Sequence, residues 1–411
     1  MPMSSGRSCI AGVGPVVEET AESSELQLDD FNLIVVGAGF FGLTIAERAA
    51  ATLGLKVGVL ERRNHIGGNS WSERDGATGI EYHKYGSHLF HTSSEEVWTY
   101  LNRFTSFTNY RHRVFTVHRG RVYSMPINLG TICALYGRHL SPGEARQLIA
   151  AEIAAERIGT PDNLEDKAIS LVGRPLYEAF IRGYTAKQWQ TDPRQLPADI
   201  ITRLPVRFSF DDGYFADRWE GLPVDGYGAI FPRMISGGSI EVQTGVDWFA
   251  LQARLAPHQL LVFTGPVDRY FEHRCGVLGW RTLDFEKEVI GVDDFQGTSV
   301  MNYADEDIPY TRIHEFKHLH PERRYEPGRT LIYREYSRFA SPQDEPYYPI
   351  ATGADKSRYE AYRALASATP NVIFGGRLGT YRYLDMHQAI GAALKVFENE
   401  VTPFFARRRS A

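Results

Sequence analysis

The chain has 411 residues and a formal net charge of -5 at pH 7, made up of 45 basic and 50 acidic residues. This length exceeds what one hydrophobic core usually serves, so we expect two or three packed units. The scattered, weakly negative charge offers no extended cationic face and excludes nucleic acid as a partner, so any anionic ligand must be held by individually placed arginines.

Residues 1–30 predict a flexible extension. Their Ser, Glu and Gly content buries too little apolar surface to offset the entropy of ordering, although pairing at an oligomer interface stays an open alternative. The apolar run from Ile10 to Val17 is too short to span a bilayer, so no membrane insertion is expected. Cys9, Cys133 and Cys275 have no metal-ligand spacing, which favours a cytoplasmic protein without a metal site.

The folded part opens with the pattern of a strand, a tight turn and a helix. Asn32 to Val36 is apolar and β-branched, the turn reads GAGFFG, and Leu43 to Leu53 carries apolar residues at helical spacing. A second run, Lys56 to Leu60, ends at Glu61 and completes a β-α-β unit. The predicted fold class is therefore α/β, beginning with a Rossmann-like parallel sheet.

The turn predicts a dinucleotide site. Gly37 permits the bend, Gly39 lets a pyrophosphate approach the backbone, and Gly42 lets the helix pack on the strand. Glu61 stands where a carboxylate can accept hydrogen bonds from ribose hydroxyls, so a glycine-rich turn without a ligand is the weaker alternative. We include Phe40 and Phe41, inside the motif, in the cofactor-binding set.

The next loop favours FAD over NAD. Gly67 and Gly68 resemble the glycine doublet of amine-oxidase-like flavoproteins and would let this loop, with Asn69, lie against the pyrophosphate. Arg62 could cover the adenine or remain a solvated surface charge.

Later segments predict a helical insertion and an antiparallel sheet. Arg113 to Tyr123 alternates like a hairpin, and Trp280 to Tyr303 and Thr330 to Tyr336 are rich in strand-forming residues. Leu129 to Ala198 reads as helical, with Ser141 as an N-cap and a proline in the first turn of one helix.

Two late strands indicate a discontinuous nucleotide domain, because Leu261 to Thr264 and Val372 to Phe374 both run into glycines. The expected units are an extension at 1–30, an FAD-binding domain at 31–97 with 222–275 and 350–411, a helical substrate or lid domain at 128–205, and an antiparallel sheet domain at 98–127 with 206–221 and 276–349.

Long segments of the chain, from about residue 31 to about residue 400, resemble the bacterial UDP-galactopyranose mutase family. They read LERRNHIGGN, HKYGSHLFHT, GYTAKQWQTDP, MNYADEDIPYTRIHEF, EYSRFASPQDEPYYPI and FGGRLGTYRYLDMH. The resemblance implies that N5 of reduced FAD attacks the anomeric carbon of UDP-galactopyranose and expels UDP. The sugar then recloses as the furanose, for use in cell-surface glycans. An external reductant such as NAD(P)H and a homodimer are also implied.

The resemblance assigns the groups that hold the nucleotide. Arg203 and Arg312 match its two diphosphate arginines, a suitable choice because guanidinium is always charged and can donate two parallel hydrogen bonds. Arg203 lies in the proline-interrupted stretch from Pro197 to Pro205, where the family has a mobile lid that would exclude water. The matching phosphate-contacting tyrosines are Tyr184, Tyr214, Tyr348 and Tyr383.

The remaining site residues also follow from motif position. Phe180 and Tyr184, four apart on a predicted helix, would form a stacking surface for uracil, with core packing as an even alternative for Phe180. The other residues expected at the substrate are Thr185, Trp189 and Asn302.

On the cofactor side, His88 matches a histidine near the flavin that could exchange protons. His83 and His91 are expected to be satisfied by backbone carbonyls. Arg377, Tyr383, Asp385 and Met386 would contact the cofactor, and Asp385 would begin a helix whose N-terminus stabilises the reduced, anionic ring.

Two other functions are compatible with the nucleotide fold. An FAD-dependent oxidase or desaturase would act on amine or apolar substrates and has little use for two arginines and four tyrosines in one cleft. A binding module without turnover would hold the nucleotide sugar and release it unchanged. The choice of galactose over another UDP-hexose is implied only by the resemblance.

Overall fold

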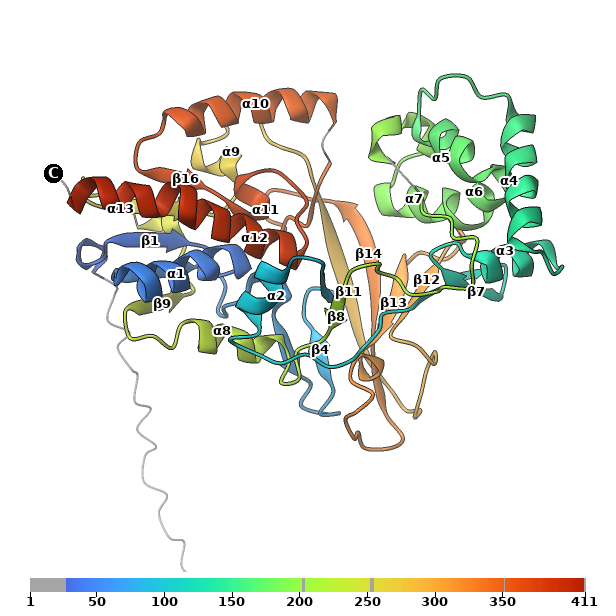
Figure 1. The fold of residues 1–411 in the computed structure, drawn as a ribbon, viewed down its shortest axis with the longest axis horizontal. Coiled ribbons are helices and arrows are strands. Elements are labelled where there is room, and N and C mark those ends of the chain that lie inside the picture. The colour runs from blue at the N-terminus through green and yellow to red at the C-terminus, as the bar shows by residue number, and fades with distance from the viewer. Residues whose placement is uncertain (1–26, 202–203, 252–254, 351, 410–411) are drawn as a thin grey trace, which may run out of the picture.

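The computed structural model describes residues 27–201, 204–251, 255–350 and 352–409. A parallel-sheet unit and a second, larger sheet lie side by side, and a cluster of helices projects from the far side of the second sheet (Figure 1). No helix in these described ranges has the length and apolar character needed to cross a membrane.

The first sheet has the strand order β16-β10-β1-β2-β9, and all its pairs are parallel. Its strands are β1 (Leu33–Val36), β2 (Val57–Glu61), β9 (Ile240–Thr244), β10 (Leu260–Phe263) and β16 (Val372–Phe374). This arrangement confirms the Rossmann-like α/β prediction and the late strands at β10 and β16. The strand β9 was not predicted, although its sequence IEVQT alternates apolar and polar residues between Gly238 and Gly245, a pattern typical of a short strand.

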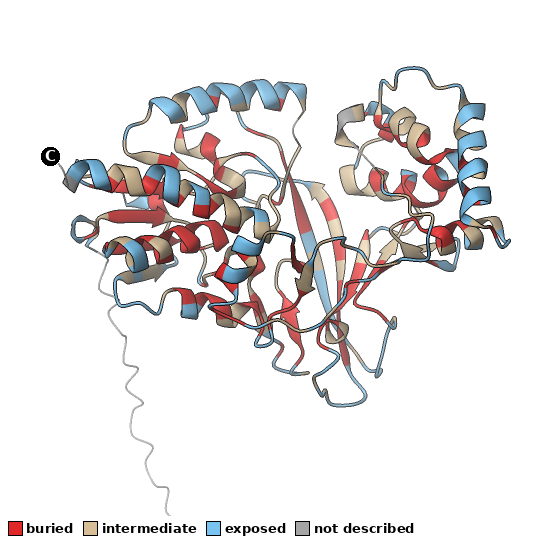
Figure 2. Cartoon of the chain, viewed as in Figure 1, coloured by how far each residue is buried: buried red, intermediate tan, exposed pale blue. Residues whose placement is uncertain are grey.

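Both faces of this sheet are buried, as expected for parallel strands covered by helices. Leu33 and Val35 of β1 pack into one core with residues of the two covering helices α1 and α12, whereas Ile34 packs into a second core on the opposite face. The helices of this unit are α1 (Phe40–Leu53), α2 (Glu95–Leu101), α8 (Ile230–Met234), α9 (Val267–Tyr270), α10 (Gly353–Ala368), α11 (Gly376–Gly379), α12 (Met386–Val396) and α13 (Thr402–Arg409). The central strands β1, β2 and β10 are buried, whereas the edge strand β9 is partly exposed and the outer side of α10 is exposed (Figure 2).

The second sheet has seven strands in the order β15-β11-β14-β13-β12-β6-β7. They are β6 (Val114–His118), β7 (Arg121–Met125), β11 (Trp280–Ile290), β12 (Val300–Tyr303), β13 (Arg312–Glu315), β14 (Thr330–Phe339) and β15 (Tyr348–Pro349). The expected β6–β7 hairpin is present, but the sheet is mixed because β12 pairs with β6 in parallel. No short turn joins β6 to β12, so nothing in the local sequence imposes an antiparallel pair.

Two short ladders lie outside the two sheets. β3 (Ser72–Arg74) pairs with β4 (Glu81–His83), and β5 (Phe90–Thr92) pairs with β8 (Trp219–Gly221). The second ladder joins the segment 206–221, expected in the sheet domain, to the segment 31–97, expected in the nucleotide domain.

The helical unit contains α3 (Leu129–Tyr136), α4 (Pro142–Glu156), α5 (Leu164–Val172), α6 (Arg174–Phe180) and α7 (Arg182–Trp189), and the first four of these helices share a core of their own. Ser141 caps α4 in a capping box with Glu144, and Pro142 is its first residue, as predicted. The unit begins directly after the edge strand β7, so the sheet carries it at one edge.

The described structure begins before residue 31. Leu28–Asp30 form a 3-10 turn, and the Gln259 side-chain amide donates to the carbonyl oxygens of Leu28 (2.6 Å) and Phe31 (3.0 Å). The predicted extension is therefore wrong for residues 28–30, because a buried amide fixes them to the parallel-sheet unit. Residues 1–26 lie outside the described ranges.

Close packing at the start of α1 leads to a first prediction. A Cβ at Gly42 would lie 2.1 Å from the carbonyl oxygen of Gly37, so Gly42→Ala should lower the free energy of unfolding by about 1–3 kcal/mol, measured by thermal or urea unfolding. Gly143, in the first turn of α4, has no atom within 4 Å of its Cβ position. Gly143→Ala is thus the matched control and should leave stability unchanged or slightly raised. Equal stability of the two variants would contradict the close strand–helix packing.

Candidate functional site

A cavity of about 930 Å³ lies at the carboxyl ends of β1, β2 and β10. Val36, Glu61 and Thr264 line it from these three strand ends. The carboxyl edge of a parallel sheet is where ligands bind in doubly wound folds, and the volume is at the upper end of the range for small-molecule sites.

Two glycine loops form the floor of the cavity. Gly37 has φ +101°, and a Cβ there would lie 2.0 Å from Oγ1 of Thr264. Gly68 has φ +58°, and its Cβ would lie only 3.1 Å from Cα of Gly39, so the two backbones touch. Any side chain at these positions would fill the space between the loops and the cavity.

The N-terminus of α1 opens into the same cavity. Gly39 is the N-cap and supplies no side-chain hydrogen bond, and Phe40 and Phe41 line the cavity. The first amide groups of a helix lack partners within it and carry a partial positive charge, so this end suits a diphosphate.

Glu61 ends β2 with its carboxylate fixed by the backbone. Oε2 accepts the amide of Ala38 (2.8 Å) and Oε1 accepts the amide of Arg63 (2.9 Å). Each oxygen retains a second lone pair, so the carboxylate can still accept hydroxyl donors from a ligand in the cavity.

Arg62 and Arg63 both pair with Glu345. Arg62 Nη2 lies 2.5 Å from Glu345 Oε1, with its side chain 48% exposed, while Arg63 Nη2 lies 2.8 Å from Oε2. Arg63 also donates to Asn69 Oδ1 (2.8 Å) and covers the ring of Tyr85 at 4.3 Å. Arg63 and Glu345 were not predicted; in the sequence Arg63 cannot be distinguished from the adjacent Arg62.

Arg377 lies on the opposite wall. Its guanidinium donates to the carbonyl oxygens of Tyr347 and Leu384, each at 3.1 Å, and lies 5.1 Å from the centre of the Tyr383 ring. Asp385 is the N-cap of α12 in a capping box with Gln388, as the predicted helix start requires. The predicted cofactor residues that line the cavity are Gly37, Gly39, Phe40, Phe41, Glu61, Arg62, Gly68, Asn69, Arg377 and Met386; His88, Tyr383 and Asp385 are not among its lining residues.

His88 is held in a tight turn closed by His83. The His88 amide donates to Nδ1 of His83 (2.9 Å), the Gly86 amide donates to the His83 carbonyl (3.2 Å), and His88 Nδ1 lies 2.7 Å from the Gly86 carbonyl. A carbonyl can only accept, so Nδ1 of His88 carries the proton and Nε2 has the free lone pair. Burial, followed by the charge of Arg377, lowers the pKa of His88 to about 4 against the effect of the Gly86 bond.

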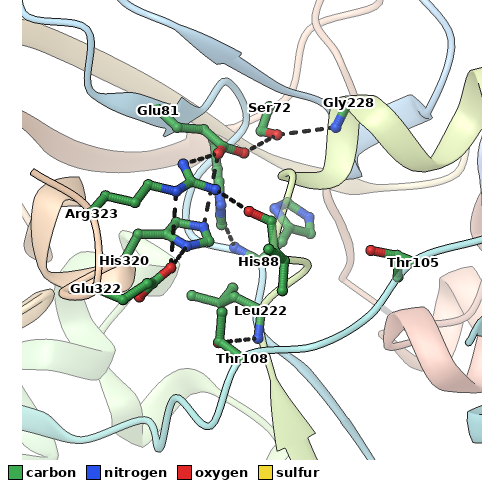
Figure 3. Close-up of polar contacts among 12 residues, drawn as sticks. Ser72, Glu81, His88, Thr105, Thr108, Leu222, Gly228, His320, Glu322 and Arg323 are labelled. Atoms are coloured by element: carbon green, nitrogen blue, oxygen red, sulfur yellow. Dashed lines mark hydrogen bonds and ion pairs between the residues drawn. The ribbon is translucent and has the colours of Figure 1, made fainter.

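A buried ion cluster supports the strand that carries His83. The Glu81 carboxylate receives Arg323 Nη1 at 2.5 Å and the Ser72 hydroxyl at 2.6 Å, and His320 lies 3.8 Å away between Glu81 and Glu322 (Figure 3). Glu81 is 5% exposed. A carboxylate this deep requires its compensating cation, so the cluster fixes β4 and with it the turn that ends at His88.

The expected carbonyl partners of His83 and His91 are wrong. His83 accepts a backbone amide through Nδ1, and its buried Nε2 has no partner among the described residues. His91 Nδ1 lies 2.6 Å from Asp217 Oδ2, and its ring stacks on Phe215 at 3.7 Å. The tertiary fold brings both partners to these histidines, so the sequence around each histidine does not predict them.

Arg312 lies in a row of polar residues across the second sheet. It pairs in register with Asn302 on β12 and with Glu335 on β14. Its Nε lies 3.2 Å from Glu335 Oε1, and its Nη2 donates to the Tyr184 hydroxyl from α7. The side chain of Arg312 is 31% exposed against 5% for Glu335, so the guanidinium faces an open space with its counter-ion behind it.

The other predicted substrate residues gather around Arg312 to different degrees. The charge of Arg312 acts on Tyr348, whose pKa burial raises to about 12, and the Tyr348 and Tyr383 rings lie 5.6 Å apart. Tyr348 and Tyr383 thus connect Arg312 to Arg377 on the cavity wall. Tyr214 is 44% exposed and within the field of Arg312, and Asn302 has a buried Oδ1 without a partner in the described structure. Thr185 and Trp189 lie on α7, Thr185 buried and Trp189 half-buried.

Phe180 does not share a helix face with Tyr184. The helix breaks at Ile181 (φ -113°, ψ -50°), between α6 and α7. Phe180 is 7% exposed and packs edge-on against Tyr123 at 5.0 Å, in the core of the helical unit. Phe180 therefore takes the core-packing alternative, and it does not form one helical stacking surface with Tyr184. Arg203 lies outside the described residues.

Lys187 fastens α7 to the second sheet. Its Nζ donates to the carbonyl oxygens of Tyr303 (2.7 Å), Asp305 (2.7 Å) and Tyr310 (3.1 Å), in and beside the loop between β12 and β13. Gly183 allows this approach, since a Cβ there would lie 2.3 Å from the Ala304 carbonyl oxygen. The contacts of Lys187 place Tyr184 beside Arg312, a role that the sequence did not suggest.

Comparisons with known proteins agree with this geometry. A family profile described as UDP-galactopyranose mutase matches residues 179–383, and one described as an NAD(P)-binding Rossmann-like domain matches residues 35–104. The chain is 42% identical to a probable UDP-galactopyranose mutase of Klebsiella pneumoniae, over 90% of this chain and 94% of that protein. It is 40% identical to a dTDP-fucopyranose mutase of Escherichia coli, over 88% of this chain and 96% of that protein.

Solved structures show the same fold. A crystal structure of reduced UDP-galactopyranose mutase matches with a TM-score of 0.69 at 16% identity, covering 90% of this chain and 95% of that one. A putrescine oxidase matches with a TM-score of 0.52 at 13% identity, covering 90% of this chain and 99% of that one.

The pKa of His88 leads to a prediction of pH dependence. Because its folded pKa of about 4 lies below the ordinary histidine pKa of 6.5, the unfolded chain takes up this proton first as the pH falls. His88 should therefore reduce stability progressively between those two pH values and not above them. Urea unfolding at about pH 7 and about pH 5 should show a smaller acid loss in His88→Asn, whose amide can still donate to Gly86, than in the unchanged protein. Equal losses would mean that His88 is solvated in the folded state.

The three bonds of Lys187 lead to another prediction. Lys187→Met leaves three part-buried carbonyls without this donor, which should cost about 1–3 kcal/mol of unfolding free energy and weaken nucleotide binding by releasing α7. Lys56→Met, at an exposed lysine, is the control and should change neither quantity. Calorimetry of unfolding and of UDP binding measures both. Unchanged UDP affinity in Lys187→Met would show that the docking of α7 by Lys187 does not contribute to nucleotide binding.

Proposed function

Because the chain belongs to the UDP-galactopyranose mutase family, we propose that it interconverts UDP-galactopyranose and UDP-galactofuranose with bound, reduced FAD. The observation that carries this proposal is the position of Arg312, which is oriented by Glu335 and Tyr184 and connected by Tyr348 and Tyr383 to the wall of the dinucleotide cavity. A site of this kind can hold a diphosphate at one end and a cofactor ring at the other.

The residues of the cavity fit FAD. The touching backbones of Gly39 and Gly68 and the uncapped N-terminus of α1 suit the pyrophosphate, and Glu61 suits the ribose. Arg377 and the N-terminus of α12 supply positive potential at the other end, which would favour an electron-rich, reduced ring. When bound, reduced FAD supplies a nucleophilic ring nitrogen that can take the sugar from its nucleotide.

The protein groups have the complementary tasks. Arg312 would retain UDP while the sugar is detached, since its guanidinium keeps its charge at any working pH. Tyr184, Tyr348 and Tyr383 can donate hydroxyl protons to phosphate oxygens without adding charge, and the pKa of Tyr184 is raised by burial, so it stays protonated. His88, neutral with a free Nε2, can accept a proton at the cofactor.

Further parts of this proposal come from the family alone. We include Arg203 as a second diphosphate group, the helical segment 128–205 as the substrate domain and Trp189 as a sugar contact. The proposal also includes an external reductant such as NAD(P)H, assembly as a homodimer and a cytoplasmic location.

The identity of the sugar nucleotide is a choice between two named chemistries, because relatives at 42% and 40% identity are called UDP-galactopyranose and dTDP-fucopyranose mutases. We favour UDP-galactose because the matching family profile carries that name. An FAD-dependent oxidase shares the fold. However, Arg312, with its paired carboxylate and the tyrosines around it, suits a polyanion better than an amine or an apolar substrate.

The direct test incubates dithionite-reduced protein with UDP-galactofuranose or UDP-galactopyranose and follows both isomers by chromatography. dTDP-fucopyranose is tested in parallel. We expect UDP-galactose to be converted with the higher kcat/KM, and only when the flavin is reduced. Faster conversion of dTDP-fucopyranose would make that sugar nucleotide the substrate in place of UDP-galactose. Conversion of neither would favour a protein that binds the nucleotide sugar without turnover.

Arg312→Ala should lower kcat/KM by at least about 100-fold, which is about 2.7 kcal/mol of transition-state stabilisation, with little change in bound flavin. Arg194→Ala removes an exposed arginine that pairs only locally with Asp192 and is the matched control, expected to keep full activity. Full activity in Arg312→Ala would rule out its role at the diphosphate.

A further inference from the structure

A chain of three polar contacts runs from the turn that carries His88 to Arg312. Ser87 Oγ lies 2.7 Å from His314 Nδ1, His314 Nε2 lies 2.9 Å from Glu335 Oε2, and Glu335 Oε1 lies 3.2 Å from Arg312 Nε. Its two central members are almost completely buried: His314 is 1% exposed and Glu335 is 3% exposed. Ser87 and His314 are separated by 227 positions in the sequence, so the tertiary fold alone creates this chain.

The donors and acceptors along the chain have one consistent direction. The Glu335 carboxylate accepts, so His314 donates through Nε2–H, and its Nδ1 is then free to accept the Ser87 hydroxyl. Burial lowers the pKa of His314 and keeps the ring neutral. Burial alone would raise the pKa of Glu335, but the Arg312 charge and the His314 bond outweigh it, so Glu335 stays ionised.

The sheet and the turn are built to make this chain. His314 follows Arg312 by two residues on β13, so both side chains project from the same face, on which Glu335 of β14 also lies. The turn approaches that face closely at Gly86, which has φ +88°; a Cβ there would lie 3.1 Å from the Phe285 ring and 3.7 Å from Glu335 Oε2. Phe285 is the in-register partner of Glu335 on β11.

We propose that His314 is a positioning residue: it fixes the Glu335 carboxylate, and thereby the direction of the Arg312 guanidinium, relative to the turn that holds His88. The inference rests on the proposed function and adds to it a residue with no substrate contact of its own. The relay fixes the spacing between the group that holds the leaving nucleotide and the histidine on the cofactor side, although these groups belong to different units of the fold.

The orientation of Arg312 needs more than Glu335 alone. A carboxylate with one cationic partner can rotate about its terminal bond and carry the guanidinium with it, whereas two further donors on the carboxylate remove that freedom. His314 supplies one of these donors. The other is the Thr311 hydroxyl, whose single proton is shared between Glu335 Oε1 (3.3 Å) and the Glu335 backbone carbonyl (3.0 Å), so His314 is the stronger of the two.

The test compares Ser87→Ala, His314→Gln, His314→Leu and the double variant Ser87→Ala/His314→Leu as flavin-loaded proteins. Glutamine can donate to Glu335 and accept from Ser87, whereas leucine can do neither. Calorimetry gives the dissociation constant of UDP, steady-state assays give KM and kcat, and thermal unfolding reports the fold.

We expect His314→Leu to weaken UDP about 10-fold and raise KM in parallel, with a smaller loss in kcat. His314→Gln should stay within about 3-fold of the unchanged protein, and Ser87→Ala should weaken UDP about 2- to 3-fold. Adding Ser87→Ala to His314→Leu should cause no further loss, because both act through one chain.

Additive losses in the double variant would overturn the relay, as would unchanged UDP affinity in His314→Leu. Equal losses in His314→Gln and His314→Leu at equal melting temperature would also overturn it. If His314→Leu fails to fold, His314→Gln and Ser87→Ala carry the same test, and wild-type UDP affinity in Ser87→Ala with a 10-fold loss in His314→Gln would contradict the relay. The unchanged protein reports on the function separately: UDP binding without sugar conversion would refute the mutase while leaving the relay open to the same measurements.

Discussion

A guanidinium paired with a buried carboxylate is the constraint around which this molecule is arranged. Taking the Glu335 carboxylate out of water is costly unless a cation and further donors compensate it, and Arg312, His314 and Thr311 all do so from one strand and the residue before it. The ladder between β13 and β14 holds the pair in register. The Glu335 carboxylate contacts one side of the guanidinium. The other side faces open space, where an anion can displace water and bind.

Each unit of the fold contributes to this one location. The parallel sheet brings a dinucleotide cavity to its carboxyl edge, the second sheet carries Arg312, and the helical unit brings Tyr184 to it on α7. Lys187 holds that helix by three backbone carbonyls, and the Ser337 hydroxyl of β14 donates to the carbonyl of Gln188, so hydrogen bonds to the main chain help to fasten the helical unit. Tyr348 and Tyr383 fill the distance between Arg312 and the cavity wall.

Local signals in the sequence predicted the local structure well. The glycines at 37, 39 and 42 and the acidic end of β2 predicted the dinucleotide turn, because they form one motif of about 25 residues in which Gly42 packs on Gly37 and Glu61 accepts the amide of Ala38. The capped helix at Ser141 was predicted for the same reason. Prediction was wrong where the tertiary fold decides: the break at Ile181 that separates Phe180 from Tyr184, the parallel pairing of β6 with β12, and the partners of His83 and His91. The relay through His314 has no local signal either, since its members come from three distant segments.

The tautomer of His88 has a consequence for the order of events at the site. Since the Gly86 carbonyl engages Nδ1, only the second ring nitrogen is open to exchange, and at neutral pH it starts empty. In the proposed reaction, His88 would therefore act first as a proton acceptor, and any donation from it would be a later step that returns the proton it has received.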